Sequence, residues 1–394
     1  MTPPGAHSML PPLSPEEQRH SESVRALVCA ELARAGGWLS FERFMELVLY
    51  APGLGYYSAG SWKLGSGGDF VTAPEVSELF GRCVATQCAD VLRLTGGEIL
   101  ELGAGSGRMA AAILSALEAR DALPERYAIL EVSGDLAARQ RARLDALPPQ
   151  LRRRIAWLER LPQAPLTGVI LANEVADALP VRRFILRGGA VRELGVALGP
   201  GDTLQAAEGP ADAALAADCE AMLGARLGTL PEGYTSEVSL RLGPWIASLA
   251  GSLERGLLLL FDYGLPRAHY YHAQRGAGTL RCHFRQRAHD DPFVNLGLQD
   301  ITAWVDFTRV AEAAVREGLE VGGFATQAAV LLALGIEREV AAAADAVGRA
   351  RLAGEARRLL MPEEMGEVFK AMALTRGCQM PLQGFSLQDL RRQL

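Results

Sequence analysis

The feature that most constrains this chain is a short apolar run that leads straight into a glycine-rich turn and a helical pattern. The run ends at Leu102, the turn carries Gly103, Gly105 and Gly107, and alanines and leucines with helical spacing cover residues 109–119. This pattern is typical of a buried parallel strand, a tight turn and a helix start. Glycine has no Cβ, so such a turn can approach a ligand closely, and the free amides at the helix start face that ligand.

The spacing in the turn distinguishes two classes of ligand. A dinucleotide fingerprint has a third glycine at its sixth position, where this chain has Arg108. Glu101 stands at the end of the strand, where a carboxylate repels a pyrophosphate but suits a cationic ligand. A nicotinamide oxidoreductase is therefore disfavoured, and a purely structural turn is the alternative. The stretch resembles motif I of the class I S-adenosylmethionine-dependent methyltransferases, whose ligand carries a sulfonium and an amino group.

Strands and helices alternate along the rest of the chain. After the strand that ends at Leu102, further strands are expected over 127–132, 155–159, 168–172, 256–261, 319–326 and 368–374. The alternation predicts an α/β fold with a parallel sheet covered by helices on both faces. The last two strands resemble the antiparallel pair that closes a class I methyltransferase sheet. We therefore expect a Rossmann-like sheet that is mostly parallel, with an antiparallel last strand.

The domain organisation follows from composition and pattern. Residues 1–20 are rich in proline and predict a disordered tail. Residues 21–92 predict a helical and loop region that packs on the core. Residues 93–394 predict the methyltransferase domain, with insertions at about 181–250 and 265–306.

Polar side chains stand where the predicted strands end. These are Glu101, Glu131, Asn173, Glu174 and Asp262. Ligands of a parallel α/β sheet bind outside the carboxyl ends of its strands. The two oxygens of Glu131 match two adjacent ribose hydroxyls, although an exposed strand-end carboxylate is the simpler alternative. Glu101 is placed to accept a hydrogen bond from the cofactor's amino group, directly or through water, with the glycine turn under the methionine part.

Several stretches together resemble one family, the MidA-like methyltransferases. They follow one another in the right order: Tyr50–Tyr57, Gly68–Glu75, Glu101–Gly107, Asn173–Pro180, Asp262–Gly264, Gly278–His283, Asp300–Phe307 and Met365–Lys370. The resemblance implies a class I methyltransferase fold, with S-adenosyl-L-methionine as methyl donor and the strand-end Asn173 near the cofactor. Mitochondrial members of the family assist respiratory complex I assembly by methylating an arginine of a core subunit. A protein arginine is therefore the expected acceptor.

An arginine acceptor sets a chemical requirement, because its protonated guanidinium is a poor nucleophile. Carboxylates can bind it through paired hydrogen bonds, localise its charge and take the released proton. The candidates are Glu174, Asp69, Glu75 and Asp177. We expect Glu174, together with Asp69 or Glu75, to orient the guanidinium. Asp69 is equally suited to cap its glycine loop and Glu75 a helix start.

Composition excludes several other classes of function. A net charge of −6 gives no basic footprint for nucleic acid, and runs such as Leu257–Phe261 are far too short for membrane insertion. The six cysteines have no CxxC spacing, and the histidines at 269–289 have no diagnostic ligand spacing, so no metal is expected. Residues 1–15 do not resemble a signal peptide, so a cytoplasmic, bacterial setting is expected.

Two alternative functions stay open at this point. The first is methylation of a small molecule, with the insertions acting as a lid. The second is a non-catalytic assembly factor that binds the cofactor without turnover. A homodimer through apolar helical patterns at 24–32 and 328–336 is compatible with the sequence, and so is ordinary core packing of these patterns.

Overall fold

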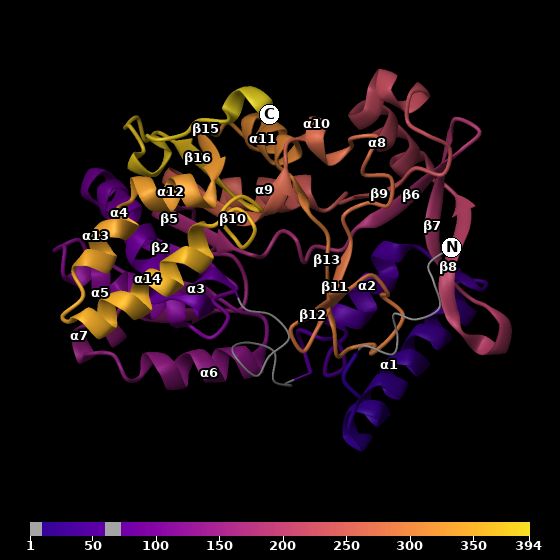
Figure 1. The fold of residues 1–394 in the computed structure, drawn as a ribbon, viewed down its shortest axis with the longest axis horizontal. Coiled ribbons are helices and arrows are strands. Elements are labelled where there is room, and N and C mark those ends of the chain that lie inside the picture. The colour runs from indigo at the N-terminus through magenta and orange to yellow at the C-terminus, as the bar shows by residue number, and fades with distance from the viewer. Residues whose placement is uncertain (1–9, 60–71) are drawn as a thin grey trace. The chain divides into compact units, whose positions relative to one another are not determined.

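The chain folds into two compact units, each built from three separate stretches. The computed structural model describes residues 10–59 and 72–394 (Figure 1). Unit 1 comprises residues 1–70, 178–241 and 268–304, and unit 2 comprises residues 71–177, 242–267 and 305–394. Both expected insertions thus join the N-terminal stretch in unit 1, apart from their edges. In the described parts of the chain, no helix has the length and apolar character needed to cross a membrane.

Unit 2 is organised around an eight-stranded sheet. Its strands are β15 (Glu320–Thr326), β16 (Phe369–Arg376), β10 (Leu253–Leu265), β5 (Leu166–Asn173), β2 (Glu98–Leu102), β3 (Tyr127–Leu130) and β4 (Ile155–Leu158) in spatial order, with β14 (Val305–Asp306) beside β10. Only β16 runs antiparallel to its neighbours, β10 and β15. The other pairings are parallel. The predicted fold class, a mostly parallel sheet with an antiparallel last strand, is confirmed.

Helices cover this sheet through a continuous apolar core. They are α3 (Ala73–Val76), α4 (Glu78–Thr95), α5 (Arg108–Glu118), α6 (Gly134–Leu144), α7 (Pro149–Arg152), α9 (Leu242–Gly251), α11 (Phe307–Arg316), α12 (Gln327–Ala333), α13 (Ile336–Ala341) and α14 (Ala346–Leu360). Alternate strand residues such as Ile99, Val169 and Leu257 are buried in one cluster with Phe80 of α4 and Ile113 of α5. Alternation places one set of side chains on each face of the sheet, and both sets are buried in β2 and β5.

The described residues of unit 1 form two antiparallel sheets and three longer helices. One sheet has β1 (Trp38–Leu39), β7 (Ala190–Leu198), β6 (Arg182–Arg187) and β9 (Thr235–Val238) in order, with β8 (Leu204–Pro210) on β7, and the other has β12 (Arg287–His289), β11 (Arg281–Phe284) and β13 (Asp300–Thr302). The helices are α1 (Pro15–Arg34), α2 (Phe41–Tyr50) and α8 (Ala213–Leu223), and α10 (Arg267–Tyr270) lies at a unit boundary. The sequence pattern also predicts short antiparallel strands over 184–186, 191–196 and 203–206 inside the first insertion, and these are present as β6, β7 and β8.

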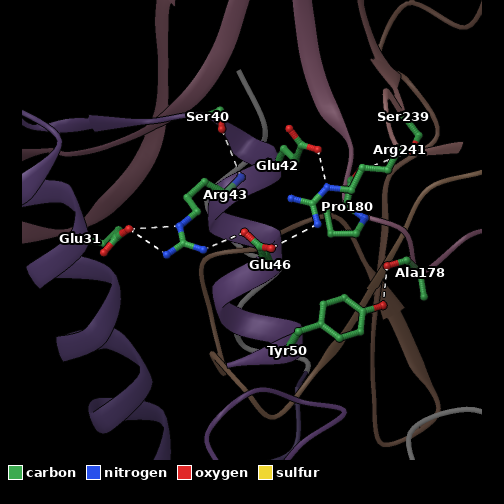
Figure 2. A network of polar contacts seen from close by, with 10 residues as sticks. All are labelled: Glu31, Ser40, Glu42, Arg43, Glu46, Tyr50, Ala178, Pro180, Ser239 and Arg241. Carbon is green, nitrogen blue, oxygen red and sulfur yellow. Dashed lines mark hydrogen bonds and ion pairs between the residues drawn. The ribbon is translucent and has the colours of Figure 1, made fainter. Parts of the chain in front are cut away.

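Charged side chains join α1, α2 and the end of the second stretch of unit 1 (Figure 2). Arg43 of α2 donates to Glu31 of α1 at 2.9 Å and to Glu46 at 2.7 Å. Arg241 donates to Glu42 at 2.6 Å and to the other oxygen of Glu46 at 3.2 Å. The two arginines are 42% and 40% exposed, so the contribution of these ion pairs to stability is small. The network therefore connects α1, α2 and Arg241 but adds little to the stability of the unit.

Three sequence expectations need correction. Helix α1 begins at Pro15, so a disordered tail over residues 1–20 is too long, because Ser14 and Glu17 form a capping box. The expected N-terminal region 21–92 is divided between the units near residue 70. The pattern over residues 327–360 predicts a helical stretch, which the structure divides into α12, α13 and α14; Gly335 adopts a left-handed conformation between the first two.

Candidate cofactor and acceptor site

The glycine turn follows β2 and precedes α5, as the sequence predicts. Gly103, Gly105 and Gly107 have φ angles of 60°, 55° and 79°, in the left-handed region that favours glycine. A Cβ on Gly107 would lie 3.4 Å from the Cα of Gln140, and one on Gly103 would lie 3.4 Å from Val175. The turn therefore needs glycine for its conformation, whereas an added Cβ on Gly103 or Gly107 would make only ordinary van der Waals contacts.

Two helices hold the turn through hydrogen bonds. On α6, Gln140 donates to the Gly105 carbonyl at 3.1 Å and Arg143 donates to the Ser106 carbonyl at 3.0 Å. Arg108 donates at 2.7 Å to the carbonyl of Glu75 in α3. The Ser106 hydroxyl donates to the Glu75 carboxylate. Glu75 is thus attached to the glycine turn. The sequence analysis instead placed it among the carboxylates that orient the arginine acceptor.

Glu101 is enclosed at the end of β2. It is 1% exposed and accepts a hydrogen bond of 2.7 Å from the Tyr127 hydroxyl of the neighbouring strand β3. Burial raises the pKa of Glu101 to about 7, and the Tyr127 hydrogen bond opposes that rise. This carboxylate sits in the core beneath the turn. Its contact with the cofactor's amino group stays a prediction.

Glu131 directly follows β3. One oxygen accepts from the Ser133 amide at 2.9 Å and the other from Gln140 at 2.8 Å. A carboxylate oxygen has two lone pairs and can accept more than one hydrogen bond, and the assignment of Glu131 to the ribose stays a prediction. The next residue, Val132, is 77% exposed. Sequence reasoning missed this apolar side chain, although its position after the strand-end carboxylate was the available signal.

Asn173 and Glu174 meet at the end of β5. Glu174 has a φ of 55°, a conformation that non-glycine residues adopt mostly at special sites. Its Oε1 accepts from Asn173 Nδ2 at 3.0 Å and from the Ala73 amide at 3.2 Å. Asn173 is 9% exposed, and its Oδ1 has no hydrogen-bond partner among the described residues. A buried acceptor left open in this way is a place where a ligand can donate.

Asp262, at the end of β10, shapes the turn that carries these groups. Its Oδ2 accepts from the amides of Ala176 and Asp177 at 2.9 and 3.3 Å, and its Oδ1 accepts from the Tyr263 amide at 2.8 Å. Burial raises the pKa of Asp262 to about 7, against the effect of these amides. Asp177 itself is 4% exposed. The fourth acidic candidate, Asp69, lies outside the described residues.

The residues at these strand ends fit a cationic cofactor that carries a ribose. The side chains here offer acceptors, chiefly Glu131, Glu174 and the open Oδ1 of Asn173. Sulfonium, amino and hydroxyl groups need acceptors, whereas a phosphate needs donors. Within the described ranges, no group of three or more His, Cys, Asp or Glu is placed to hold a metal ion. The predicted histidine-rich segment contributes His283 to β11 and His289 to β12.

The comparisons with known proteins agree with this chemistry. Residues 83–325 match the family model described as "Putative S-adenosyl-L-methionine-dependent methyltransferase". The mitochondrial protein arginine methyltransferase NDUFAF7 of Danio rerio is 28% identical over 386 residues, which cover 89% of this chain and 87% of that protein. The Drosophila melanogaster homologue is 29% identical, with coverage of 80% and 76%.

A solved structure adds the cofactor. A Burkholderia thailandensis protein, crystallised with S-adenosyl-homocysteine bound, has a TM-score of 0.92 and 41% identity, covering 98% of this chain and 100% of that one. The match extends over the glycine turn and all the strand ends described above. This chain belongs to the S-adenosyl-L-methionine-dependent methyltransferases, as a MidA-like class I member that uses S-adenosyl-L-methionine as its methyl donor.

Proposed function

We propose that this methyltransferase acts on an arginine side chain of a protein. The observation that carries the proposal is the half-buried Glu174 carboxylate, held at a left-handed backbone position by Asn173 and the Ala73 amide. Such a carboxylate can accept the paired N–H groups of a guanidinium. Curated relatives that cover most of this chain are named protein arginine methyltransferases, which supports the same acceptor.

We assign a task to each residue of the site. The bound cofactor supplies an activated methyl group, so the protein mainly has to position the acceptor and exclude water. Glu174 localises the guanidinium charge and accepts the proton that methylation releases. Asn173 orients Glu174 through Nδ2 and offers its open Oδ1 to an N–H group. Asp262 holds the backbone of the turn that carries Glu174 and Asp177.

For the cofactor, we assign the methionine part to the glycine turn and the ribose hydroxyls to Glu131. The exposed side chain of Val132 then packs against the adenine, because it directly follows the ribose carboxylate. Glu75 supports the turn through Ser106. The carboxylates at these strand ends favour cations over anions. That preference fits an arginine acceptor better than a phenol or a carboxylate.

As physiological acceptor, we propose a subunit of a complex I-type respiratory enzyme, with the reaction in the cytoplasm. For the acceptor, the support is the family resemblance of the stretches between Tyr50 and Lys370. A homodimer has less support, because the apolar side chains at 24, 28 and 32 and at 330, 331, 334 and 336 are buried in apolar clusters of the chain itself. Affinity capture by the full chain, followed by mass spectrometry of captured and methylated proteins, tests both partner assignments.

The decisive experiment measures methyl transfer from labelled S-adenosylmethionine into an arginine-bearing protein acceptor, with wild type, Glu174→Gln and Glu363→Gln. Glu363 is an exposed carboxylate outside the site, so Glu363→Gln serves as the matched control. We expect Glu174→Gln to lower kcat by about 100-fold or more, with the cofactor Kd unchanged. Normal turnover by Glu174→Gln would refute its role. Label found only in small molecules supports the small-molecule alternative, and cofactor binding without transfer supports the assembly-factor alternative.

A further inference from the structure

One buried side chain, Gln140 of α6, contacts both parts of the cofactor site. It is 0% exposed. Its Nε2 donates to the Gly105 carbonyl at 3.1 Å and to Glu131 Oε2 at 2.8 Å, and its Oε1 accepts from the Trp157 indole at 3.0 Å. An amide nitrogen carries two N–H groups, so each donor has its own acceptor. A fully satisfied polar group of this kind in the interior is rigid.

Trp157 fixes which way this amide points. The indole nitrogen can only donate, so the amide oxygen must face Trp157 and the amide nitrogen must face Glu131 and Gly105. A flipped amide would set its oxygen against the Glu131 carboxylate and leave the indole N–H unpaired. Trp157 lies in the edge strand β4, and the guanidinium of Arg141 stands 4.8 Å from the centre of its ring.

The contacts join parts of the chain that are distant in sequence. Gly105 follows β2, Glu131 follows β3 and Trp157 belongs to β4, and Gln140 meets all three. The α6 backbone lies close to the turn at Gln140, since a Cβ on Gly107 would stand 3.4 Å from the Cα of Gln140. One side chain thus sets the spacing between the glycine turn and the carboxylate assigned to the ribose.

We propose that Gln140 is a positioning residue that orients Glu131 toward the cofactor ribose and keeps the glycine turn in register with it. This inference rests on the proposed assignment of Glu131 to the ribose. Gln140 acts through Glu131 and the turn, so its loss affects cofactor binding and leaves the chemical step intact once cofactor is saturating.

The test compares Gln140→Met with Gln150→Met. Methionine keeps the length of the side chain but has no amide, and Gln150 is an exposed glutamine of α7 whose amide donates to Glu118 at 2.8 Å. Calorimetric titration with S-adenosyl-homocysteine is expected to show a Kd raised about tenfold for Gln140→Met, the equivalent of one to two hydrogen bonds. Gln150→Met is expected to match wild type, and kcat at saturating cofactor is expected to be unchanged in both.

A second ligand separates positioning from general destabilisation. The 2′-deoxyribose analogue of S-adenosyl-homocysteine lacks one hydroxyl that Glu131 is assigned to bind. We expect Gln140→Met to reduce the preference for the ribose form over this analogue. An equal loss of affinity for both ligands, or no loss for either, overturns the proposal. Failure of wild type to bind S-adenosyl-homocysteine would instead contradict the cofactor assignment itself.

The variant Trp157→Phe keeps the test valid if Gln140→Met does not fold. It retains an aromatic ring but removes the indole N–H that sets the amide, together with part of the ring system. The expected result is a smaller rise in Kd, about threefold, with the same loss of preference for the ribose form. An unchanged ribose preference in a folded Trp157→Phe protein contradicts the proposed role of the amide orientation.

Discussion

At the scale of single residues, the strand-end carboxylates divide into a half-buried group and a fully buried group. Glu131 and Glu174 are half-buried, whereas Glu101 and Asp262 are almost completely buried. The enclosed pair holds a neighbouring hydroxyl or backbone amides, and burial raises the pKa of both to about 7. These two residues therefore shape the loops in which the more exposed carboxylates act.

The raised pKa of Glu101 predicts a specific pH dependence of stability. A carboxyl group whose pKa is higher in the folded state contributes stability that is fully present below the unfolded value of 4.5 and is lost as the pH rises through about 7. Between these limits, the unfolding free energy of wild type is expected to fall by about 3 kcal/mol relative to Glu101→Gln. Urea denaturation at a series of pH values measures this difference, and parallel profiles would contradict it.

At the scale of elements, three glycines in register bring β2, β5 and β10 close together at their amino ends. A Cβ on Gly97 would lie 2.0 Å from the carbonyl oxygen of Thr167, and one on Gly168 would lie 2.1 Å from that of Glu98. A Cβ on Gly256 would lie 1.9 Å from the carbonyl oxygen of Gly168. The ladder pairs Glu98 with Gly168 and Gly168 with Gly256. The backbones themselves fill this space, so it cannot be opened by moving a side chain.

Gly168→Ala is therefore expected to destabilise unit 2 by about 2 kcal/mol or more, from the backbone clash and from its φ of 131°. Gly354→Ala is the matched control, because Gly354 lies inside α14 with nothing within 4 Å of an added Cβ. That change is expected to stabilise the protein by about 0.5–1 kcal/mol. Chemical denaturation of both variants checks the pair, and a neutral Gly168→Ala would show that the strands can separate at no cost.

The predictability of each element depended on where its stabilising contacts come from. The strands of the main sheet are apolar runs, so their own residues reveal them. Strand β9 was missed because it carries Ser236 and Glu237 in buried positions. Glu237 is stabilised by Arg183 and by the Thr279 amide, at 3.3 and 2.7 Å, and such distant partners leave no local hydrophobic pattern.

The same distinction applies to the site. The positions of the glycine turn, Glu131 and Glu174 after β2, β3 and β5 were predictable, because each follows an apolar strand; their roles toward a ligand stay predictions that rest on where ligands of a parallel sheet bind. Gln140 was missed, since nothing in the sequence around it shows that Gly105 and Trp157 are its neighbours. The contact of Glu75 with Ser106 likewise joins residues that are 31 positions apart. Local pattern predicts the position of the site, and tertiary contacts decide which side chains support it.

At the scale of the whole molecule, the chain crosses between the two units five times, near residues 70, 177, 241, 267 and 304. Unit 1 is held together across its three stretches by an apolar cluster that includes Phe44, Val196 and Ile301. All described residues assigned to the cofactor, from Glu101 to Asn173, lie in unit 2. The assignment therefore separates cofactor binding from the integrity of unit 1.

That separation predicts different outcomes for two matched core variants. Phe44 and Phe80 are both 0% exposed; Phe44 contacts Phe41 and Phe293 within unit 1, and Phe80 contacts Phe261 of β10 within unit 2. Changing either to leucine is expected to cost about 1 kcal/mol or more. Phe80→Leu should weaken binding of S-adenosyl-homocysteine, because Phe261 immediately precedes Asp262, which holds the turn after β5. Phe44→Leu should leave that affinity within about twofold of wild type, which corresponds to less than about 0.5 kcal/mol. Calorimetric titration of both variants with S-adenosyl-homocysteine decides the question. Equal losses of affinity would mean that the two units respond as one cooperative body. Unit 2 alone would then not determine cofactor binding.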